Sequence, residues 1–471
     1  MHLLRRALLL SFALPVALSA QRRAPVPTRS IDWPALEREG LALLRDYLRV
    51  NTTNPPGNEL EAARFLRDFL AKQGIDAQIL DTTELGAGRA NLYARIKGNG
   101  SKRAIALVHH MDVVPATVST WTVPPFSGVL RDGFVYGRGA LDMKSEGIAQ
   151  IMAVVALKRG GVPLTRDLVI IANADEELGS TGALVFADRH ADLLRDVEFL
   201  FTEGGSNSVR NDTLRFRGVG VSEKRTFWQR LTVRGTPSHA SRPTKDNPVP
   251  RLIAALDRLA RYETPLHVLP GVDRYFRDIS RDYPGERGRW LQDVSKALED
   301  PRAREWILSD VYWNAILRNT ISITGLQGSN KTNVIPPEAS ADVDIRLLPD
   351  QNPDSVLATL EAVVADTAVS FTPLIVPKPP FHSATNTDFF RAVERASREH
   401  DPDAVLTTTM MTGATDRPMY RRLGFEVYGV DPFRANEVDR QRGVHGNDER
   451  ISAADFLSGI HFLFDVLRYV Q

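Results

Sequence analysis

The chain has 471 residues, more than the roughly 100–200 of a typical domain, so we expect two domains. Its hydrophobic content of 43% and charged content of 25% are those of a globular protein with a substantial core. The formal net charge of +1 gives no electrostatic reason to expect nucleic acid or an anionic membrane as a partner. No cysteine is present, so any metal must be bound by His, Asp and Glu.

The N-terminus has the pattern of an export signal. The positively charged "MHLLRR" is followed by the apolar stretch "ALLLSFALPVALSA", which ends in small residues. This stretch is shorter than the roughly 20 residues needed to span a bilayer, so cleavage near Ser19 or Ala20 is favoured over an uncleaved anchor. We therefore expect residues 1–20 to be a signal peptide and 21–33 a leader. The mature protein would be periplasmic or secreted, without stable insertion in a membrane.

Residues 34–220 alternate amphipathic helix patterns with short apolar runs. The helix patterns are "WPALEREGLALLRDYLRV", "NELEAARFLRDFLAKQG" and "KSEGIAQIMAVVALKRGG". The strand patterns are "NLYARIKG", "AIALVHH", "DLVIIANA" and "VEFLFTE". This alternation predicts an α/β fold with a mostly parallel sheet and helices on both faces. In such sheets ligands bind beyond the carboxyl ends of the strands.

From residue 221 to 377 the order of patterns changes to β-α-β-β-α-β. This order predicts a small ferredoxin-like α+β domain inserted into the first one. The catalytic domain would then consist of residues 34–220 and 378–471. Within the insertion, residues 263–315 form a segment too long for an ordinary loop, which predicts extra helices or a substrate-facing element.

Candidate metal ligands follow the strand patterns of the first segment. In "ALVHHMDVVP", His110 and Asp112 stand at alternate positions of an extended chain, so both side chains project to the same side. The adjacent His109 points the other way, toward the core, and we assign it no role. Comparable positions at strand ends or before helices are held by Asp142, Glu176, Glu177, Glu203 and, in "GVHGNDERIS", His445.

Three consecutive acids at residues 175–177 directly follow a buried strand pattern. Ionised carboxylates at such a place repel one another and lose hydration, so they require a positive partner. Two divalent cations supply it, because zinc accepts both imidazole nitrogen and carboxylate oxygen. A mononuclear oxygenase site of His110, Asp112 and His445 is an alternative, but it leaves three glutamates without a role.

Five motifs resemble, in order and spacing, those of the aminoacylase/carboxypeptidase family of di-zinc hydrolases. They are "HHMDVVP", "GRGALDMK", "DEELGSTG", "EGG" and "HGNDE". The family includes acetylornithine and succinyl-diaminopimelate deacylases, carnosine dipeptidases and glutamate carboxypeptidases. "HMDVVP", "NTISITGLQGSNKTNVIP" and the long insertion are most similar to the branch of carboxypeptidase S and secreted N-acyl-amino-acid hydrolases. The resemblance implies a zinc-exopeptidase-like fold with an inserted lid or dimerisation domain.

The resemblance also implies two zinc ions per chain, with Co²⁺ or Mn²⁺ as substitutes. The implied ligands are His110 and Glu203 for one zinc, Glu177 and His445 for the other, and Asp142 as a bridge between them. Asp112 would orient His110 from behind. Glu176 would be the general base that deprotonates a metal-bridging water and returns the proton to the leaving amine.

Substrate contacts are implied in the same way. His239 in "GTPSHASRP" matches the family histidine that reaches the substrate carbonyl oxygen, commonly from a partner subunit, and would stabilise the oxyanion by roughly 3–4 kcal/mol. Asn333 and Arg346 match positions that hold the free carboxylate of the substrate, a task that suits the planar fork of arginine. Gly413 and Thr415 in "TGATDRP" occupy the glycine-rich substrate loop, in which alanine stands where a second glycine is common.

These features predict an exported di-zinc metallohydrolase that cleaves an amide bond next to a free α-carboxylate. Release of the C-terminal residue of short peptides is favoured because an exported enzyme can scavenge peptides, and the alternative is an N-acyl-amino-acid hydrolase. The expected partners are such a substrate and a second copy bound through the inserted domain, with His239 acting in cis or in trans. A binding protein of the same fold would be expected to have lost the base or a ligand, and this chain keeps all six.

Overall fold

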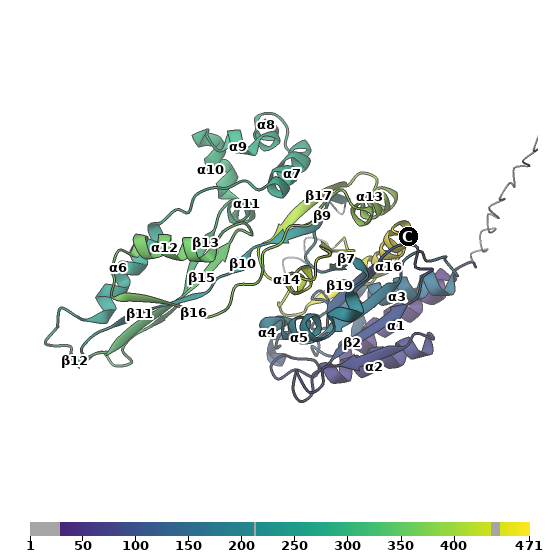
Figure 1. Ribbon diagram of the computed structural model, residues 1–471, viewed down its shortest axis with the longest axis horizontal. Coiled ribbons are helices and arrows are strands. Elements are labelled where there is room, and N and C mark those ends of the chain that lie inside the picture. Colours follow the sequence, from purple (N-terminus) through teal and green to yellow (C-terminus); the bar gives the residue numbers. More distant parts are fainter. Residues whose placement is uncertain (1–28, 212, 435–442) are drawn as a thin grey trace, which may run out of the picture.

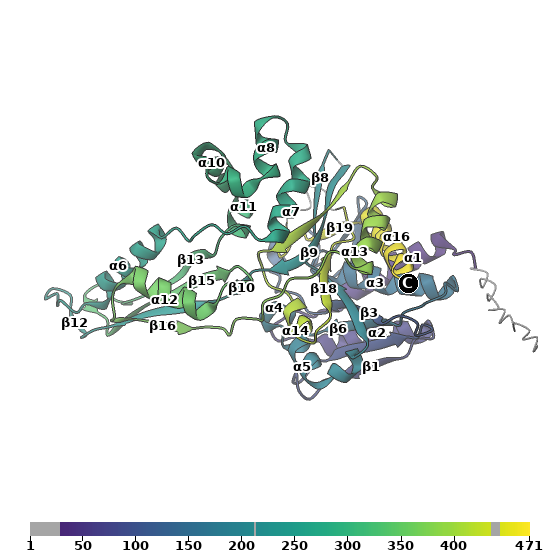
Figure 2. The ribbon, with the colours of Figure 1, turned by 45° about the horizontal axis from the view of Figure 1, so that its top comes forward.

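The computed structural model describes residues 29–211, 213–434 and 443–471 and contains a large and a small sheet (Figure 1). The expected signal peptide lies outside the described residues, as does the leader up to residue 28. The large sheet and its helices occupy one end of an elongated molecule, and the small sheet extends away from them (Figure 2). None of the helices in the described ranges combines the length and the apolar character that crossing a bilayer requires.

The large sheet has nine strands within the described ranges, in the order β1-β2-β6-β3-β7-β18-β9-β17, with β8 paired to β9. Its strands are β1 (Ala77–Leu80), β2 (Asn91–Ile96), β3 (Ala104–His110), β6 (Leu168–Asn173), β7 (Val197–Thr202), β8 (Ser206–Arg210), β9 (Thr213–Glu223), β17 (Val405–Met411) and β18 (Glu426–Val430). The central strands β6, β3, β7 and β18 are parallel, and so are β9 and β17. The contacts of β2 with β1 and β6, and of β18 with β9, are antiparallel. The predicted α/β class with a mostly parallel centre is confirmed.

Helices cover both faces of this sheet because its strands are apolar on both sides. In β3, Ile105 and Leu107 pack into one core cluster, whereas Ala106 and Val108 pack into the other. The first face is covered by α1 (Trp33–Arg49), α2 (Glu59–Lys72), α3 (Lys144–Arg159), α13 (Asp388–His400) and α16 (Ala453–Tyr469). The second face is covered by α5 (Thr181–Arg189) and α14 (Arg417–Arg421). Short elements complete this end: α4 (Glu176–Gly179), 3₁₀ turns at Val118–Thr120 and Ala191–Leu194, and a three-stranded sheet of β4 (Val129–Arg131), β5 (Phe134–Tyr136) and β19 (Arg450–Ser452).

The small sheet has the ferredoxin-like order that the sequence predicts. Its strands are β10 (Arg225–Thr226), β11 (Gln229–Arg234), β13 (Thr320–Gln327), β15 (Glu338–Leu347) and β16 (Val369–Pro373). β15 pairs antiparallel with β11 and β13, and β16 pairs antiparallel with β11. The helices α6 (Pro248–Arg261) and α12 (Pro353–Val364) pack together on its apolar face. A two-stranded ribbon of β12 (Ser238–His239) and β14 (Val334–Ile335) forms the tip that lies farthest from the large sheet in both views (Figures 1 and 2).

The segment at 263–315 folds into a helical lobe around an aromatic core. Its helices are α7 (Pro270–Ile279), α8 (Glu286–Gln292), α9 (Val294–Ala297), α10 (Pro301–Ser309) and α11 (Val311–Ile316), with a 3₁₀ turn at Ser280–Asp282. Phe276 and Trp313 pack edge to face, and α7 lies against β17, the edge strand of the large sheet. Lys224 joins the lobe to the small sheet, because its buried ammonium donates to the carbonyls of Ala315 and Arg318 at 2.9 Å each. The predicted extra helices are therefore present.

Candidate active site

Three adjacent parallel strands bring the candidate ligands to one edge of the large sheet. β3 lies between β6 and β7, and the carboxyl ends of parallel strands meet at the same edge. His110 is the last residue of β3, and Glu203 directly follows β7. Glu176 and Glu177 begin α4, just beyond the end of β6. The fold itself thus gathers four of the predicted site residues.

Two loops add the remaining candidates. Asp142 precedes α3, but the N-cap of that helix is Met143, so Asp142 is not a helix cap. The Nε2 atom of His110 lies 2.9 Å from Asp142 Oδ1, and that of His445 lies 3.2 Å from Asp142 Oδ2. His445 Nε2 also lies 3.2 Å from Glu177 Oε2. Each oxygen of Asp142 therefore faces a different histidine, which is the arrangement that a bridging carboxylate needs.

A buried ion pair, which the sequence analysis did not single out, holds these two loops together. Arg138 donates to Glu449 at 2.6 Å and to the carbonyl of His445 at 3.2 Å. Glu449 accepts backbone N–H groups from Leu141 at 2.7 Å and from Asp142 at 3.2 Å. Both residues stand inside motifs quoted above, "GRGALDMK" and "HGNDE", so the signal was present.

Asp112 contacts His110, but mainly through its backbone. His110 Nδ1 lies 2.9 Å from the carbonyl oxygen of Asp112 and 3.6 Å from its carboxylate. A carbonyl can only accept, so Nδ1 carries a proton, and Nε2, which faces Asp142, is the nitrogen that can ligate a metal once it gives up its own proton. The Asp112 carboxylate instead accepts the backbone N–H groups of Glu176 and Glu177 at 3.0 and 3.1 Å. Asp112 thereby positions both the histidine and the glutamate pair.

The first of the three consecutive acids has a structural partner. Asp175 forms a buried ion pair with Arg89 and accepts a hydrogen bond from Asn54 at 2.8 Å. The same Asn54 amide donates to Asp112 at 2.8 Å, so this network supports the loop from behind. Only Glu176 and Glu177 therefore face the site. Asp175 is satisfied without a metal.

Burial and mutual repulsion shape the protonation of the acids. Burial, together with the charge of Asp142, raises the pKa of Glu203 to about 8. Burial and the charge of Glu203 raise the pKa of Glu176 well above its usual range. Hydrogen bonds to Asp142 and Glu177 raise the pKa of His445 to about 10. Burial opposes ionisation of Asp142, but hydrogen bonds from His110 and His445 lower its pKa overall.

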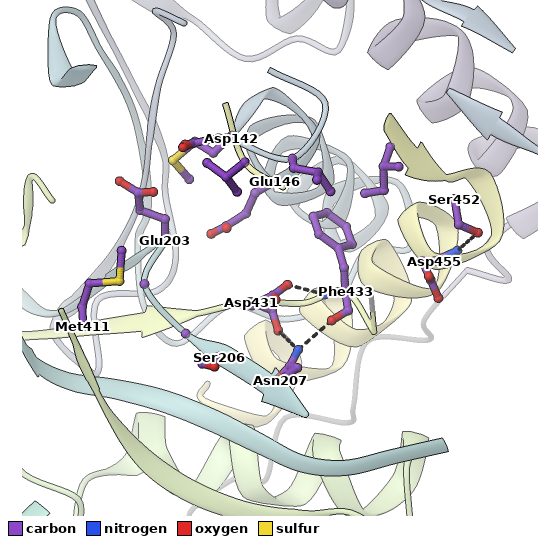
Figure 3. Close-up of a pocket in the computed structure, with 16 residues that line it drawn as sticks. Asp142, Glu146, Glu203, Ser206, Asn207, Met411, Asp431, Phe433, Ser452 and Asp455 are labelled. Atoms are coloured by element: carbon purple, nitrogen blue, oxygen red, sulfur yellow. Dashed lines mark hydrogen bonds between the residues drawn. The ribbon is translucent and has the colours of Figure 1, made fainter. Parts of the chain in front are cut away.

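Two cavities open on the ligand cluster, and both are lined by Asp142 and Glu203. The first has a volume of about 370 Å³ and is shown in Figure 3, with Met411 beside Glu203. The apolar part of its lining consists of Leu141, Met143, Met411, Phe433, Val444 and Ile451, and its carboxylates are Asp142, Glu146, Glu203, Asp431 and Asp455. The second, also of about 370 Å³, lies between the two sheets and adds Glu176, Glu177, His445, Thr226, Trp228, Arg346, Ile375, Lys378 and Gly413 to its lining. None of the described residues at 263–315 lines either cavity.

The small sheet delivers only part of the predicted substrate site. Arg346 lines the second cavity, where its fork binds Asp344 at 2.8 and 3.1 Å and Thr226 at 3.1 Å. His239 and Asn333 are exposed residues of the distal tip, remote from the ligand cluster in both views (Figures 1 and 2). The tip is held together locally, since the N–H of Ala240 donates to the Asn333 carbonyl at 2.9 Å.

The two residues of the predicted substrate loop differ in their exposure. Gly413 lines the second cavity. Thr415 is fully buried, and its hydroxyl donates to Glu223 at 2.7 Å and accepts from Arg417 at 3.1 Å. Arg417, which the sequence analysis did not single out, lies buried directly beneath Gly204, next to Glu203.

The residues present fit a pair of divalent metal ions. Two groups of potential ligand atoms each lie within 4.8 Å of one another: His110, Asp142 and Glu177, and His110, Glu176 and Glu203. The Oε1 atom of Glu177 is buried and has no hydrogen-bond partner among the described residues. A buried carboxylate oxygen without a partner is costly, and a cation resolves that cost. His, Asp and Glu donors without thiolate suit zinc, cobalt or manganese.

The fold and this site define a metal-dependent hydrolase of the peptidase or amidohydrolase type. The chain belongs to peptidase family M20/M25/M40, whose family model matches residues 106–469. This confirms the family that the five motifs predict.

Three relatives illustrate the match. The human "N-fatty-acyl-amino acid synthase/hydrolase PM20D1" is 31% identical over 376 residues, which are 77% of this chain and 73% of the human protein. The "Probable carboxypeptidase S-like 2" of Dictyostelium discoideum is 26% identical over 381 residues, 79% of this chain and 72% of that protein. The crystal structure of an M20 family metallo-carboxypeptidase from Sulfolobus solfataricus has a TM-score of 0.71 at 19% identity and covers 92% of this chain and 99% of that chain. The similarity to the Sulfolobus solfataricus structure shows that the two proteins share a fold.

Proposed function

We propose that the protein hydrolyses N-acyl-amino acids that carry an apolar acyl group, at the amide bond next to a free α-carboxylate. The observation that carries this proposal is the cavity of about 370 Å³ beside Asp142 and Glu203, whose lining combines carboxylates with an apolar wall that includes Phe433 and Ile451. Each CH₂ group buried in such a cavity contributes about 0.8 kcal/mol. The name of the human relative, an N-fatty-acyl-amino acid synthase/hydrolase, supports the same class of substrate.

The positions of the two cavities support one orientation of the substrate. Asp142 and Glu203 line both cavities, so the scissile amide lies beside them. The acyl group enters the first cavity, and the amino-acid part lies in the second cavity, where Arg346 faces its carboxylate. Trp228 and Ile375 of the second cavity offer apolar contact to the amino-acid side chain.

The chemistry requires one carbon–oxygen bond to form and one carbon–nitrogen bond to break. Two zinc ions, held by His110, Asp142, Glu177, Glu203 and His445, would supply Lewis-acid polarisation and lower the pKa of water. Glu176 takes a proton from the attacking water and later gives it to the leaving nitrogen.

Two further elements belong to this proposal. His239 lies at the tip of the small sheet, remote from its own ligand cluster, which supports a role in the site of a partner subunit of a homodimer. There it would donate to the carbonyl oxygen as negative charge develops. The charged and then apolar N-terminus supports export to the periplasm or the medium.

Hydrolysis of short peptides at the C-terminal residue, which the sequence favours, is the second candidate function. The same contact between Arg346 and a free carboxylate serves both substrate classes. The Dictyostelium relative, named as a probable carboxypeptidase, supports this candidate.

A chain-length series tests the proposal. The purified protein is assayed with zinc, cobalt and manganese on acetyl-, butyryl-, octanoyl- and palmitoyl-amino acids and on matched dipeptides, with products identified by mass. We expect kcat/KM to rise by up to about fourfold per CH₂ until the cavity is filled. Peptide cleavage with no gain from acyl-chain length would favour the second candidate instead.

A further inference from the structure

The second cavity presents a problem for an anionic substrate. Its lining includes four carboxylates: Asp142, Glu176, Glu177 and Glu203. Two metal ions would neutralise part of this charge, but a substrate carboxylate still needs a cation beyond them. Apart from His445, which pairs with the acids, the described cations that line this cavity are Arg346 and Lys378.

Arg346 already has a carboxylate partner. Its Nε and Nη2 atoms donate to the two oxygens of Asp344 at 2.8 and 3.1 Å, which is a bidentate pair. The charge that Arg346 offers to a substrate is therefore largely balanced. A carboxylate that bound here would have to share the fork with Asp344.

Lys378 lies in the same cavity and has no carboxylate in direct contact with its ammonium, although Asp416, Glu223 and Glu176 lie near enough to interact with its charge. Its Nζ atom donates to Ser180 Oγ at 2.6 Å and to the Thr415 carbonyl at 2.9 Å, and both acceptors are neutral. Among the described residues, its direct hydrogen-bond partners are these two neutral oxygens, whereas Arg346 is held directly by a carboxylate. An ammonium has three donors, so one N–H remains for a ligand.

The position of Lys378 ties together the segments that surround the substrate. It follows β16 on the return from the small sheet, and its backbone carbonyl accepts from Arg225 Nε at 2.8 Å. Ser180 directly follows α4, the helix that begins with Glu176. Thr415 lies two residues beyond Gly413, which also lines the cavity. A group bound to the Lys378 ammonium is thereby placed relative to the general base.

We propose that Lys378 binds the α-carboxylate of the substrate from the large-sheet side, opposite Arg346, and so selects substrates with a free carboxylate. This inference rests on the proposed function, because it requires a substrate with that group. Lysine acts here as a point charge, and two neutral hydrogen-bond acceptors orient it. The half-buried side chain is screened from water only in part, so the gain comes from the hydrogen bond and from local charge.

The test compares an N-acyl-amino acid with its carboxamide on the wild type, Lys378→Met and Lys378→Arg. Lys72→Met, an exposed lysine in α2, is the control. We expect Lys378→Met to lower the preference for the free acid by about 10–100-fold, mainly through KM, with Lys378→Arg recovering part of it. Metal content and thermal unfolding are measured on each variant, because a loss of metal or fold would lower activity on acid and amide alike.

The outcomes separate the two proposals. A wild type that prefers the acid, together with a Lys378→Met variant that keeps the full preference, overturns the role of Lys378 alone. A fall in kcat that is equal for acid and amide also overturns it, because it indicates a merely structural lysine. A wild type that does not discriminate between acid and amide overturns the proposed function, and the role of Lys378 with it.

Discussion

The two sheets present functional residues in opposite ways. At the edge of the large sheet, candidate ligands stand at the ends of buried strands, at the start of a short helix or in two adjoining loops. The Asp112 carboxylate holds the backbone of the glutamate pair. On the small sheet, Arg346 lies at the end that reaches the second cavity, whereas His239 lies on an exposed ribbon at the far tip. The first arrangement is complete within the described residues of one chain. The second depends on where the small sheet lies relative to the large sheet of the same chain or of a second copy.

This difference shows which parts of a site a fold can build by itself. Parallel strands bring their carboxyl ends together regardless of sequence distance, so ligands placed there converge. A residue at the tip of an extended domain gains no such proximity. It meets a substrate only through domain movement or through a second copy of the chain.

The largest expected effect comes from replacing, one at a time, the two neighbouring glutamates at the edge of the large sheet. Glu176→Gln should keep both metals and lose about 10²–10⁴-fold in kcat, since a general base is lost. Glu177→Gln should instead lose metal, because its carboxylate faces His445 at 3.2 Å. Metal content by elemental analysis and kcat are measured for both, with the exposed Glu305→Gln as the control. Near wild-type turnover in Glu176→Gln would contradict the assignment.

The tip of the small sheet gives the second prediction. His239→Ala should lose about 10²–10³-fold in kcat although the residue is remote from its own ligand cluster, because an oxyanion donor is removed. Mixing His239→Ala with Glu176→Gln and allowing subunits to exchange should restore activity, since a mixed dimer contains one intact site. If no activity returns while the dimer forms, His239 does not act across subunits.

Metal affinity should depend on pH through the titrating ligands at the edge of the large sheet, and His239 on the small sheet should not contribute. Without metal, Glu203 with a pKa of about 8 and His445 with a pKa of about 10 hold protons at pH 7. His110 does so too, because its burial, which lowers its pKa, is outweighed by hydrogen bonds to Asp112 and Asp142, which raise the pKa well above the usual value. Metal binding must release them, so the affinity should rise between about pH 6 and 8, by about tenfold per pH unit for each proton released. Calorimetry in buffers of different ionisation enthalpy measures the proton count, and His239→Ala should leave it unchanged. An affinity independent of pH would contradict the two pKa values.

The smallest expected effect concerns Arg346, the part of the small sheet that reaches the cavity. Arg346→Lys keeps the charge but loses the planar fork, so KM for an N-acyl-amino acid should rise by about 3–10-fold with kcat nearly unchanged. Steady-state kinetics on the acid and its carboxamide measure this change. An equal rise in KM for the carboxamide would show that Arg346 does not contact the carboxylate.

Much of the site could be read from the sequence because the information is local. The apolar runs that end in His110 and Glu203 predict buried strands with polar ends, and alternating helices predict that these strands are parallel. The ferredoxin-like order of the small sheet follows from the same periodicities. The motifs then placed the chain in its family.

The tertiary structure decided how residues from distant segments meet. The sequence indicated Asp112 as the partner of His110, but only packing placed its carbonyl, at 2.9 Å, nearer than its carboxylate, at 3.6 Å. The ion pair between Arg138 and Glu449 and the burial of Thr415 were also visible only in the tertiary structure.

The remoteness of His239 from its own ligand cluster was equally a matter of tertiary structure. Periodicity encodes where elements begin and which side they bury. The distances between elements arise from how their side chains fill a common core, and no local pattern records them.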